Sequence, residues 1–147
     1  MYAMISGAPF VPTSHKKVKR MLDLVDLKKH EKFIDLGSGD GRLVFAAAQK
    51  CDHATGVEIS PMLHIISKLK KIKNKIKNAT LIRDTLWNID LKEYDVVSIY
   101  FIPHRMKKLK KKIKREMKPG SRIVSHAFTF PDWQDVAKDD TIYIYKV

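Results

Sequence analysis

The chain has 147 residues, of which 44% are hydrophobic, so it is long enough and apolar enough to bury the core of one domain. No stretch approaches the roughly 18 consecutive apolar residues of a membrane-spanning helix, and residues 1–12 lack the pattern of a secretory signal. The formal net charge of +13 favours anionic partners, namely nucleic acid, an anionic membrane or an acidic protein surface.

The first half of the chain predicts an N-terminal arm and a helix, followed by strands that alternate with helices. The arm carries the stretch 9–13, and Thr13 or Ser14 is expected to cap a helix that runs to about Leu27. We then expect a strand over 32–36, a helix over 41–50, a strand over 54–58, a helix over 61–77 and a strand over 80–83. The lone Cys51 falls at a helix end, where we expect it to be buried, and it excludes an internal disulfide and a Cys-rich metal site.

The second half begins with a nearly continuous apolar run over 95–101, which is typical of a central strand in a parallel sheet. A helix over 104–117 follows, and Pro119-Gly120 ends it before a strand over 122–128. The last strand is expected over 141–147. Only about a dozen residues separate these two strands, too few for a helical crossover, so the last strand is expected to run antiparallel. The predicted fold is therefore α/β, with a mostly parallel twisted sheet and helices on both faces.

Two lysine-rich segments carry much of the positive charge, and in 107–118 eight of twelve residues are Lys or Arg. Apolar residues recur at helical spacing in both segments, at Ile65, Leu69, Ile72 and Ile76, and at Met106, Leu109, Ile113 and Met117. We interpret both segments as amphipathic helices with a lysine-rich solvent face. Neither has the aromatic residues that stack on bases, so we expect at most a weak association with nucleic acid through them.

Residues 33–41 read Phe-Ile-Asp-Leu-Gly-Ser-Gly-Asp-Gly and are the most informative stretch of the chain. Glycines are needed where a backbone turns sharply beneath a ligand, and the helix that starts after them adds unpaired N–H groups. Seventeen residues after Gly41, Glu58 ends the second strand, where an acid commonly binds the ribose hydroxyls of a nucleoside cofactor. The alternative is an ordinary strand–turn–helix unit followed by a solvated glutamate.

Four blocks of the sequence, 9–13, 35–42, 85–97 and 125–133, together resemble one family of enzymes. The second block fits any class I S-adenosylmethionine-dependent methyltransferase. The first (Pro-Phe-Val-Pro-Thr) and the fourth (Ser-His-Ala-Phe-Thr-Phe-Pro-Asp-Trp) resemble the small archaeal protein lysine methyltransferases and the mitochondrial ones that act on a component of ATP synthase and on the adenine nucleotide translocase. Thr85 and Ala127 depart from the acidic residues of those families, and the N-terminal membrane segment of the mitochondrial enzymes has no counterpart in this sequence.

The resemblance implies that S-adenosylmethionine binds over the first strand–helix turn, and no spacing in the sequence suggests a metal site. The glycine loop would pass under the methionine part of the cofactor, Glu58 would bind the ribose, and the arm would fold over the site as a lid. Asp35 would orient the loop or meet the ammonium group, and either Asp84 or Thr85 would contact the adenine edge. The expected cofactor-binding residues are Pro12, Thr13, Asp35, Gly37, Ser38, Gly39, Gly41, Glu58, Ile59, Asp84, Thr85 and Leu86.

A lysine acceptor must lose a proton before it can attack the donor methyl group, which at pH 7 costs roughly 4–5 kcal/mol for an amine of pKa about 10.4. We expect Tyr100 and His126 to be the catalytic residues, and Phe10, Tyr100, Phe101 and His126 to bind the substrate. Aromatic faces hold a lysine stem and its cation, and His126, expected to titrate near neutral pH, can accept a proton. A purely structural role remains open for Tyr100 and His126, as does simple packing of the arm for Phe10.

We therefore expect one domain over 1–147, in which 1–30 cover the cofactor site and 31–147 form a Rossmann-like core. The expected function is methyl transfer to lysine ε-amines of proteins, with broad specificity. The alternative is an RNA or DNA methyltransferase that uses the basic surface, although residues 100–103 lack the Asn or Asp that grips a flipped base. A non-catalytic nucleic-acid-binding protein is disfavoured by the intact glycine loop. We expect a monomer in the cytoplasm.

Overall fold

The computed structural model describes residues 4–5, 8–9, 12–100 and 104–147. Phe10 and Phe101, two of the expected substrate-binding residues, lie outside the described residues. The elements in chain order are β1 (Met4–Ile5), β2 (Ala8–Pro9), α1 (His15–Val25), β3 (Lys32–Leu36), α2 (Arg42–Ala48), β4 (His53–Val57), α3 (Pro61–Lys73), β5 (Ala79–Ile82), a 3-10 turn (Leu86–Asn88), β6 (Val96–Tyr100), α4 (Met106–Glu116), β7 (Arg122–His126), β8 (Ala137–Asp139) and β9 (Ile142–Lys146).

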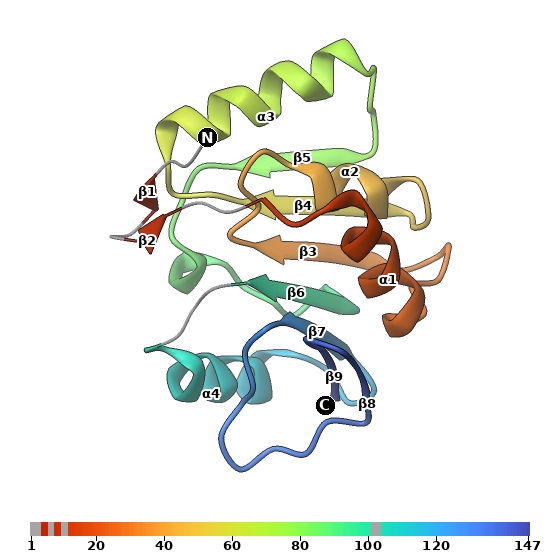
Figure 1. The fold of residues 1–147 in the computed structure, drawn as a ribbon, viewed down its shortest axis with the longest axis vertical. Coiled ribbons are helices and arrows are strands. Elements are labelled where there is room, and N and C mark those ends of the chain that lie inside the picture. The colour runs from red at the N-terminus through yellow and green to blue at the C-terminus, as the bar shows by residue number, and fades with distance from the viewer. Residues whose placement is uncertain (1–3, 6–7, 10–11, 101–103) are drawn as a thin grey trace.

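A seven-stranded sheet in the order β5-β4-β3-β6-β7-β9-β8 forms the centre of the molecule (Figure 1). Strands β3 to β7 pair in parallel, and β9 pairs antiparallel with both β7 and β8. The last strand therefore inserts between β7 and β8, which confirms the expected antiparallel strand in a mostly parallel sheet. The strand order reverses between β3 and β6, and ligands bind at such a switch point in open α/β sheets.

Each face of the sheet is covered by its own apolar cluster. On one face α1 and α2 pack on side chains such as Phe33 and Val124, and on the other α4 packs on side chains such as Ile34 and Ile123. These residues alternate along β3 and β7, as a sheet buried on both faces requires. The expectation of helices on both faces is confirmed, and α3 lies along the β5 edge (Figure 1).

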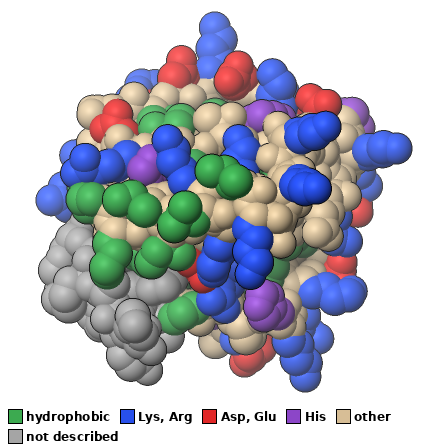
Figure 2. Space-filling model, turned by 90° about the horizontal axis from the view of Figure 1, so that it is seen from above, with side chains coloured by type: hydrophobic (Ala, Val, Ile, Leu, Met, Phe, Trp, Pro, Cys, Tyr) green, Lys and Arg blue, Asp and Glu red, His purple; other side chains and the backbone are tan. Residues whose placement is uncertain are grey.

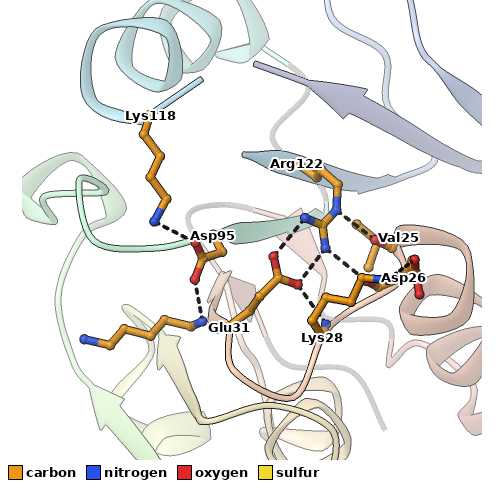
Figure 3. A network of polar contacts seen from close by, with 8 residues as sticks. Val25, Asp26, Lys28, Glu31, Asp95, Lys118 and Arg122 are labelled. Atoms are coloured by element: carbon orange, nitrogen blue, oxygen red, sulfur yellow. Dashed lines mark hydrogen bonds and ion pairs between the residues drawn. The ribbon is translucent and has the colours of Figure 1, made fainter. Parts of the chain in front are cut away.

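A polar network fixes the amino ends of the central strands, away from the carboxyl ends where ligands bind (Figure 3). Arg122, at the start of β7, donates to both carboxylate oxygens of Glu31 and to the carbonyl oxygens of Val25 and Asp26 at the end of α1. Asp95, just before β6, accepts a 2.8 Å hydrogen bond from the Lys32 amide and pairs with Lys118. The network joins α1, β3, β6 and β7 and leaves the opposite edge of the sheet for function.

The caps and faces of the helices agree with the sequence in α1 and α4 but not in α3. Ser14, one of the two expected caps, accepts a hydrogen bond from the Lys17 amide and begins α1. Helix α4 buries its apolar row as expected. In α3 the expected amphipathic arrangement is wrong: Leu63 and Ser67 are buried, whereas the row that includes Leu69 is exposed. Along the described part of the chain, no helix has the length and apolar character needed to cross a membrane.

Two short elements were not expected. The antiparallel pair of β1 and β2 lies in the stretch interpreted as an arm, and β8 lies in the segment before the last strand. Strand β8 consists of Ala137, Lys138 and Asp139. Three residues without apolar alternation give no strand signal, and β8 forms because β9 offers it an unpaired edge.

Cys51 follows α2 and is buried in the apolar cluster beneath α1 and α2, as expected from its place at a helix end. Burial raises the pKa of its thiol to about 11. The thiolate that reacts with oxidants and alkylating agents is therefore scarce at neutral pH in the folded protein.

Candidate functional site

The glycine loop 37–41 joins β3 to α2 at the carboxyl edge of the sheet. Gly37 and Gly41 have φ angles of +89° and +88°, which residues with a side chain rarely adopt. The amides of Gly37 and Ser38 both donate to the Val57 carbonyl, at 2.8 and 2.9 Å. A Cβ atom on Gly41 would lie 2.7 Å from the ring of Phe45, so the loop is packed tightly against α2. The loop is thus held flat across the end of β4, with little side-chain bulk above it.

Glu58 lies directly after β4 and binds the backbone on both sides of it. Its Oε1 accepts a 2.8 Å hydrogen bond from the Gly39 amide, and its Oε2 accepts a 2.9 Å hydrogen bond from the Ser60 amide before α3. The residue is only 1% exposed. The glutamate is therefore not the solvated residue of the alternative interpretation. Each of its oxygens keeps a second lone pair for another donor.

Asp35 is a second buried acid at this edge. It lies on β3 beside Ser98 of β6, at the point where the strand order reverses. Burial, together with the charge of Glu58, raises the pKa of Asp35 well above its usual value. A cationic group placed next to Asp35 would reverse this effect and favour the carboxylate. The geometry suits a positively charged ligand at this edge.

A charged cluster, which motif reasoning missed, connects the loop to α3 and to the start of α1. Asp40 accepts hydrogen bonds from Arg42 and from Lys70 of α3, the latter at 2.8 Å. Although burial alone favours its protonated form, these hydrogen bonds lower the pKa of Asp40 to about 2. Arg42 also donates to the Thr13 carbonyl at 2.9 Å. The only sequence signal was that Asp40 and Arg42 belong to the block shared by class I methyltransferases.

Tyr100 and His126 end the neighbouring strands β6 and β7 and lie opposite each other in register. Their rings stack with centroids 4.4 Å apart. Thr13 Oγ1 lies 3.4 Å from His126 Nδ1, so the residues before α1 reach both β7 and, through Arg42, the glycine loop. The structure thus brings together Thr13 and the two expected catalytic residues.

The expectation that His126 titrates near neutral pH is wrong. Burial of the imidazole, with a further contribution from the positive charge of Lys17, lowers the pKa of His126 from 6.5 to about 4. Asp140 acts in the opposite direction but does not compensate. At neutral pH the ring is therefore uncharged, and it is a weak base for a lysine ammonium group.

The residues expected around the adenine follow β4 and β5. Ile59 is exposed and presents an apolar side chain directly after Glu58. Asp84 Oδ1 accepts hydrogen bonds from the Thr85 amide and the Asn88 side chain, and Thr85 caps the short 3-10 turn that begins at Leu86. All of them lie at the carboxyl edge, and their contacts with an adenine ring remain predictions.

An open depression of about 470 Å³ lies beside this edge, between the start of α4 and the segment after β7. His104, Lys107, Phe128 and Phe130 are among the residues that line it. Pro12 is half-buried next to Thr13. Within the described residues, no group of three or more His, Cys, Asp or Glu side chains is arranged to hold a metal ion.

Comparison with known proteins places these features in a family. The model of the ANTKMT methyltransferase domain matches residues 35–137. A protein-lysine N-methyltransferase of Saccharolobus islandicus is 33% identical, over 97% of this chain and 96% of its own length. The lysine N-methyltransferase of Homo sapiens that is named for the c-type subunit of ATP synthase is 32% identical over 85% of this chain and 54% of its own length. The adenine nucleotide translocase lysine N-methyltransferase of Mus musculus is 34% identical over 95% and 63%.

Among solved structures, an RNA methyltransferase from Salinibacter ruber in complex with S-adenosyl-L-homocysteine superposes with a TM-score of 0.88. It is 31% identical and covers 92% of this chain and 93% of its own. Structures under 25% identical, such as a precorrin-6y C5,15-methyltransferase from Geobacter metallireducens with a TM-score of 0.74, share the fold. The sheet order, the glycine loop and the match over most of the chain lead to one conclusion: the chain is a class I methyltransferase that belongs to the family of the ANTKMT methyltransferase domain.

Proposed function

We propose that the protein transfers a methyl group from S-adenosylmethionine to lysine side chains of other proteins. The observation that carries the proposal is the Glu58 carboxylate, which lies at the end of β4 and is bonded to the glycine loop through Gly39. It places an acceptor for two hydroxyl groups beside a flat, glycine-rich backbone at the switch point of the sheet. The relatives that span most of the chain are named as lysine methyltransferases, which supports the lysine substrate.

The residues at the carboxyl edge fit this cofactor. When bound, S-adenosylmethionine supplies a methyl group on a positively charged sulfonium. The remaining lone pairs of Glu58 accept hydrogen bonds from the ribose hydroxyls, and the apolar side chain of Ile59 packs against the adenine. Asp35 faces the cationic methionine part, and the added positive charge draws the pKa of Asp35 downward. The chain thus contributes alignment and charge, as methyl transfer from an activated donor requires.

The acceptor lysine approaches past the stacked pair of Tyr100 and His126. Their ring faces hold the lysine stem, and the depression lined by Phe128 and Phe130 admits the polypeptide that carries it. Burial between these rings removes water from the ammonium group, and Lys17, which already disfavours a charge on His126, adds repulsion. Both effects lower the pKa of the incoming lysine and offset the cost of its deprotonation.

His126 takes part as a neutral ring. With a pKa of about 4 it does not store the proton of the lysine, which passes to water. The ring instead accepts or donates one hydrogen bond and fixes Thr13 over the site. We propose that this contact, with the bond from Arg42 to the Thr13 carbonyl, holds residues 1–30 against the cofactor site.

Methylation of RNA is the second candidate. The Salinibacter ruber structure is named as an RNA methyltransferase, and the net charge of +13 suits a polyanion. The lysine substrate is preferred because three relatives named for lysine methylation match 85% or more of the chain. We further propose that the protein acts as a monomer, as one domain over 1–147, in the cytoplasm.

A labelling experiment separates the two candidates. The purified protein is incubated with S-adenosylmethionine labelled in the methyl group and with a cell extract, and samples are then treated with protease or with nuclease. We expect the label to be lost with protease and to be recovered as methyl-lysine after acid hydrolysis. Label that survives protease and is lost with nuclease contradicts the proposal and supports the RNA substrate. The Glu58→Gln variant, which lacks the carboxylate for the ribose, is the negative control.

A further inference from the structure

Helix α3 exposes a row of large apolar side chains that the proposed function does not use. Five of the six exposed large hydrophobic residues in the described part of the chain lie on α3 or directly before it. The row on the helix consists of Met62, Ile65, Leu69 and Ile72, and we call it the α3 stripe. Figure 2, which looks down on α3, shows hydrophobic side chains gathered on this face with Lys and Arg side chains around them. Contiguous exposed apolar surface of this kind marks an interaction site.

The orientation of α3 is fixed by contacts on its opposite side. Leu63 and Ser67 are buried there, and Lys70 forms a 2.8 Å ion pair with Asp40 of the glycine loop. The residues of the stripe follow each other at intervals of three and four, so they share the outward face. Turning the stripe inward would break the contact between Lys70 and Asp40. The stripe is therefore a stable surface of the fold, with Leu69 at 62% and Ile72 at 73% exposure.

The surroundings of the stripe define the charge of its partner. Helix α3 contains no acidic residue, and Lys68, Lys71 and Lys73 lie along it, with Lys75 just beyond its end. Two copies of the chain meeting through the stripe would bring these lysines together, so charge opposes a symmetric dimer. The partner must combine an apolar interior with a negatively charged surface.

We propose that α3 is a docking surface for an anionic lipid bilayer, with the stripe inserted among the acyl chains and the lysines bound to the headgroups. An apolar row flanked by lysines is the arrangement of helices that lie in the membrane interface, about 5–10 Å deep. A protein partner is less suited, because α3 projects as a convex ridge at the edge of the molecule (Figure 1). The depression described above lies elsewhere, at the carboxyl ends of β6 and β7.

Binding of the full-length protein to vesicles tests the proposal without cofactor or methyl transfer, so its outcome is independent of the enzymatic function. The probes are vesicles of phosphatidylcholine alone and vesicles in which about one third of the lipid is phosphatidylglycerol. We expect binding to the anionic vesicles only. The double variant Leu69→Ser, Ile72→Ser should bind roughly tenfold more weakly for each side chain removed. Val136→Ser, which changes a residue 61% exposed far along the chain, is the matched control and should bind as the unaltered protein does.

A second pair of variants tests the lysines at constant net charge. Lys68→Glu with Lys73→Glu should abolish binding to the anionic vesicles, whereas Lys29→Glu with Lys111→Glu, at exposed positions away from α3, should weaken it far less. Equal loss in both variants would mean that the overall positive charge alone attracts the vesicles, and would overturn the proposal. So would unchanged binding of the Leu69→Ser, Ile72→Ser variant. A dimer in solution that this variant dissociates would assign the stripe to a second copy instead.

Discussion

Glu58 is the residue whose removal most directly tests how the cofactor binds. Glu58→Gln keeps the volume and shape of the side chain but replaces one acceptor oxygen with an NH₂ group, which cannot accept from the Gly39 or the Ser60 amide. One buried N–H is then left without a partner, which costs about 1–3 kcal/mol of folding stability. The glutamine also has no charge and only one oxygen to offer the ribose.

The effect on binding follows from the same hydrogen bonds. One charge-assisted bond to a ribose hydroxyl is lost and the other is weakened, together about 3 kcal/mol, which corresponds to a roughly hundredfold higher Kd for S-adenosylmethionine. Titration calorimetry with S-adenosylmethionine and S-adenosylhomocysteine measures this change, and urea unfolding without ligand measures the stability. Because both ligands carry the same ribose, we expect both affinities to fall by a similar factor.

Glu93→Gln is the matched control, since Glu93 is exposed and its ion pair with Lys32 spans 4.0 Å. It should change neither the stability nor the affinity. If Glu58→Gln lowers the stability but leaves both Kd values within about twofold of the unaltered protein, Glu58 serves only to pin the glycine loop to Ser60. The reasoning on the ribose would then be wrong.

Three further changes have defined outcomes. Between pH 6.5 and 4 the unfolded chain binds a proton at His126 that the folded chain does not, so stability should fall by up to about 3 kcal/mol as the pH is lowered through this range. Urea unfolding of His126→Gln should lack this part of the pH dependence, and identical profiles would contradict the low pKa. Gly56→Ala places a Cβ atom 2.8 Å from Ser38 and Val44, so overpacking should destabilise the fold by about 1–3 kcal/mol in urea unfolding. A chain that begins at Ser14 keeps the cap of α1 but loses the Thr13 contacts, so we expect a folded protein by circular dichroism with roughly tenfold weaker binding of the cofactor by calorimetry, and an unchanged affinity would refute the role of the arm.

The parts of the site that the sequence predicted correctly are those set by local geometry. The glycine loop follows a buried strand and precedes a helix, so its position at the end of β3 depends on only a few neighbouring residues. Glu58 follows β4 in the same way. Parallel pairing of these strands then brings both to one edge of the sheet, whatever the rest of the chain does.

The parts that the sequence did not predict depend on contacts between distant segments. Helical spacing in α3 showed that one face is apolar but not that the face with Leu63 and Ser67 would turn inward. The low pKa of His126 depends on Lys17, and the low pKa of Asp40 depends in part on Lys70, neither of which is near its partner in the sequence. Strand β8 forms only because β9, after pairing with β7, still has one edge to pair.

The single thiol of Cys51 offers a built-in clock for opening of the sheet. It is enclosed by α1 and α2, the two layers that lie over the glycine loop side of β3 and β4. A maleimide or disulfide reagent gains access only when these layers separate, so the rate of alkylation in native buffer reports how often they do so. Comparing that rate with and without bound nucleoside reveals whether ligand binding restrains this motion, in a protein that requires no engineered label.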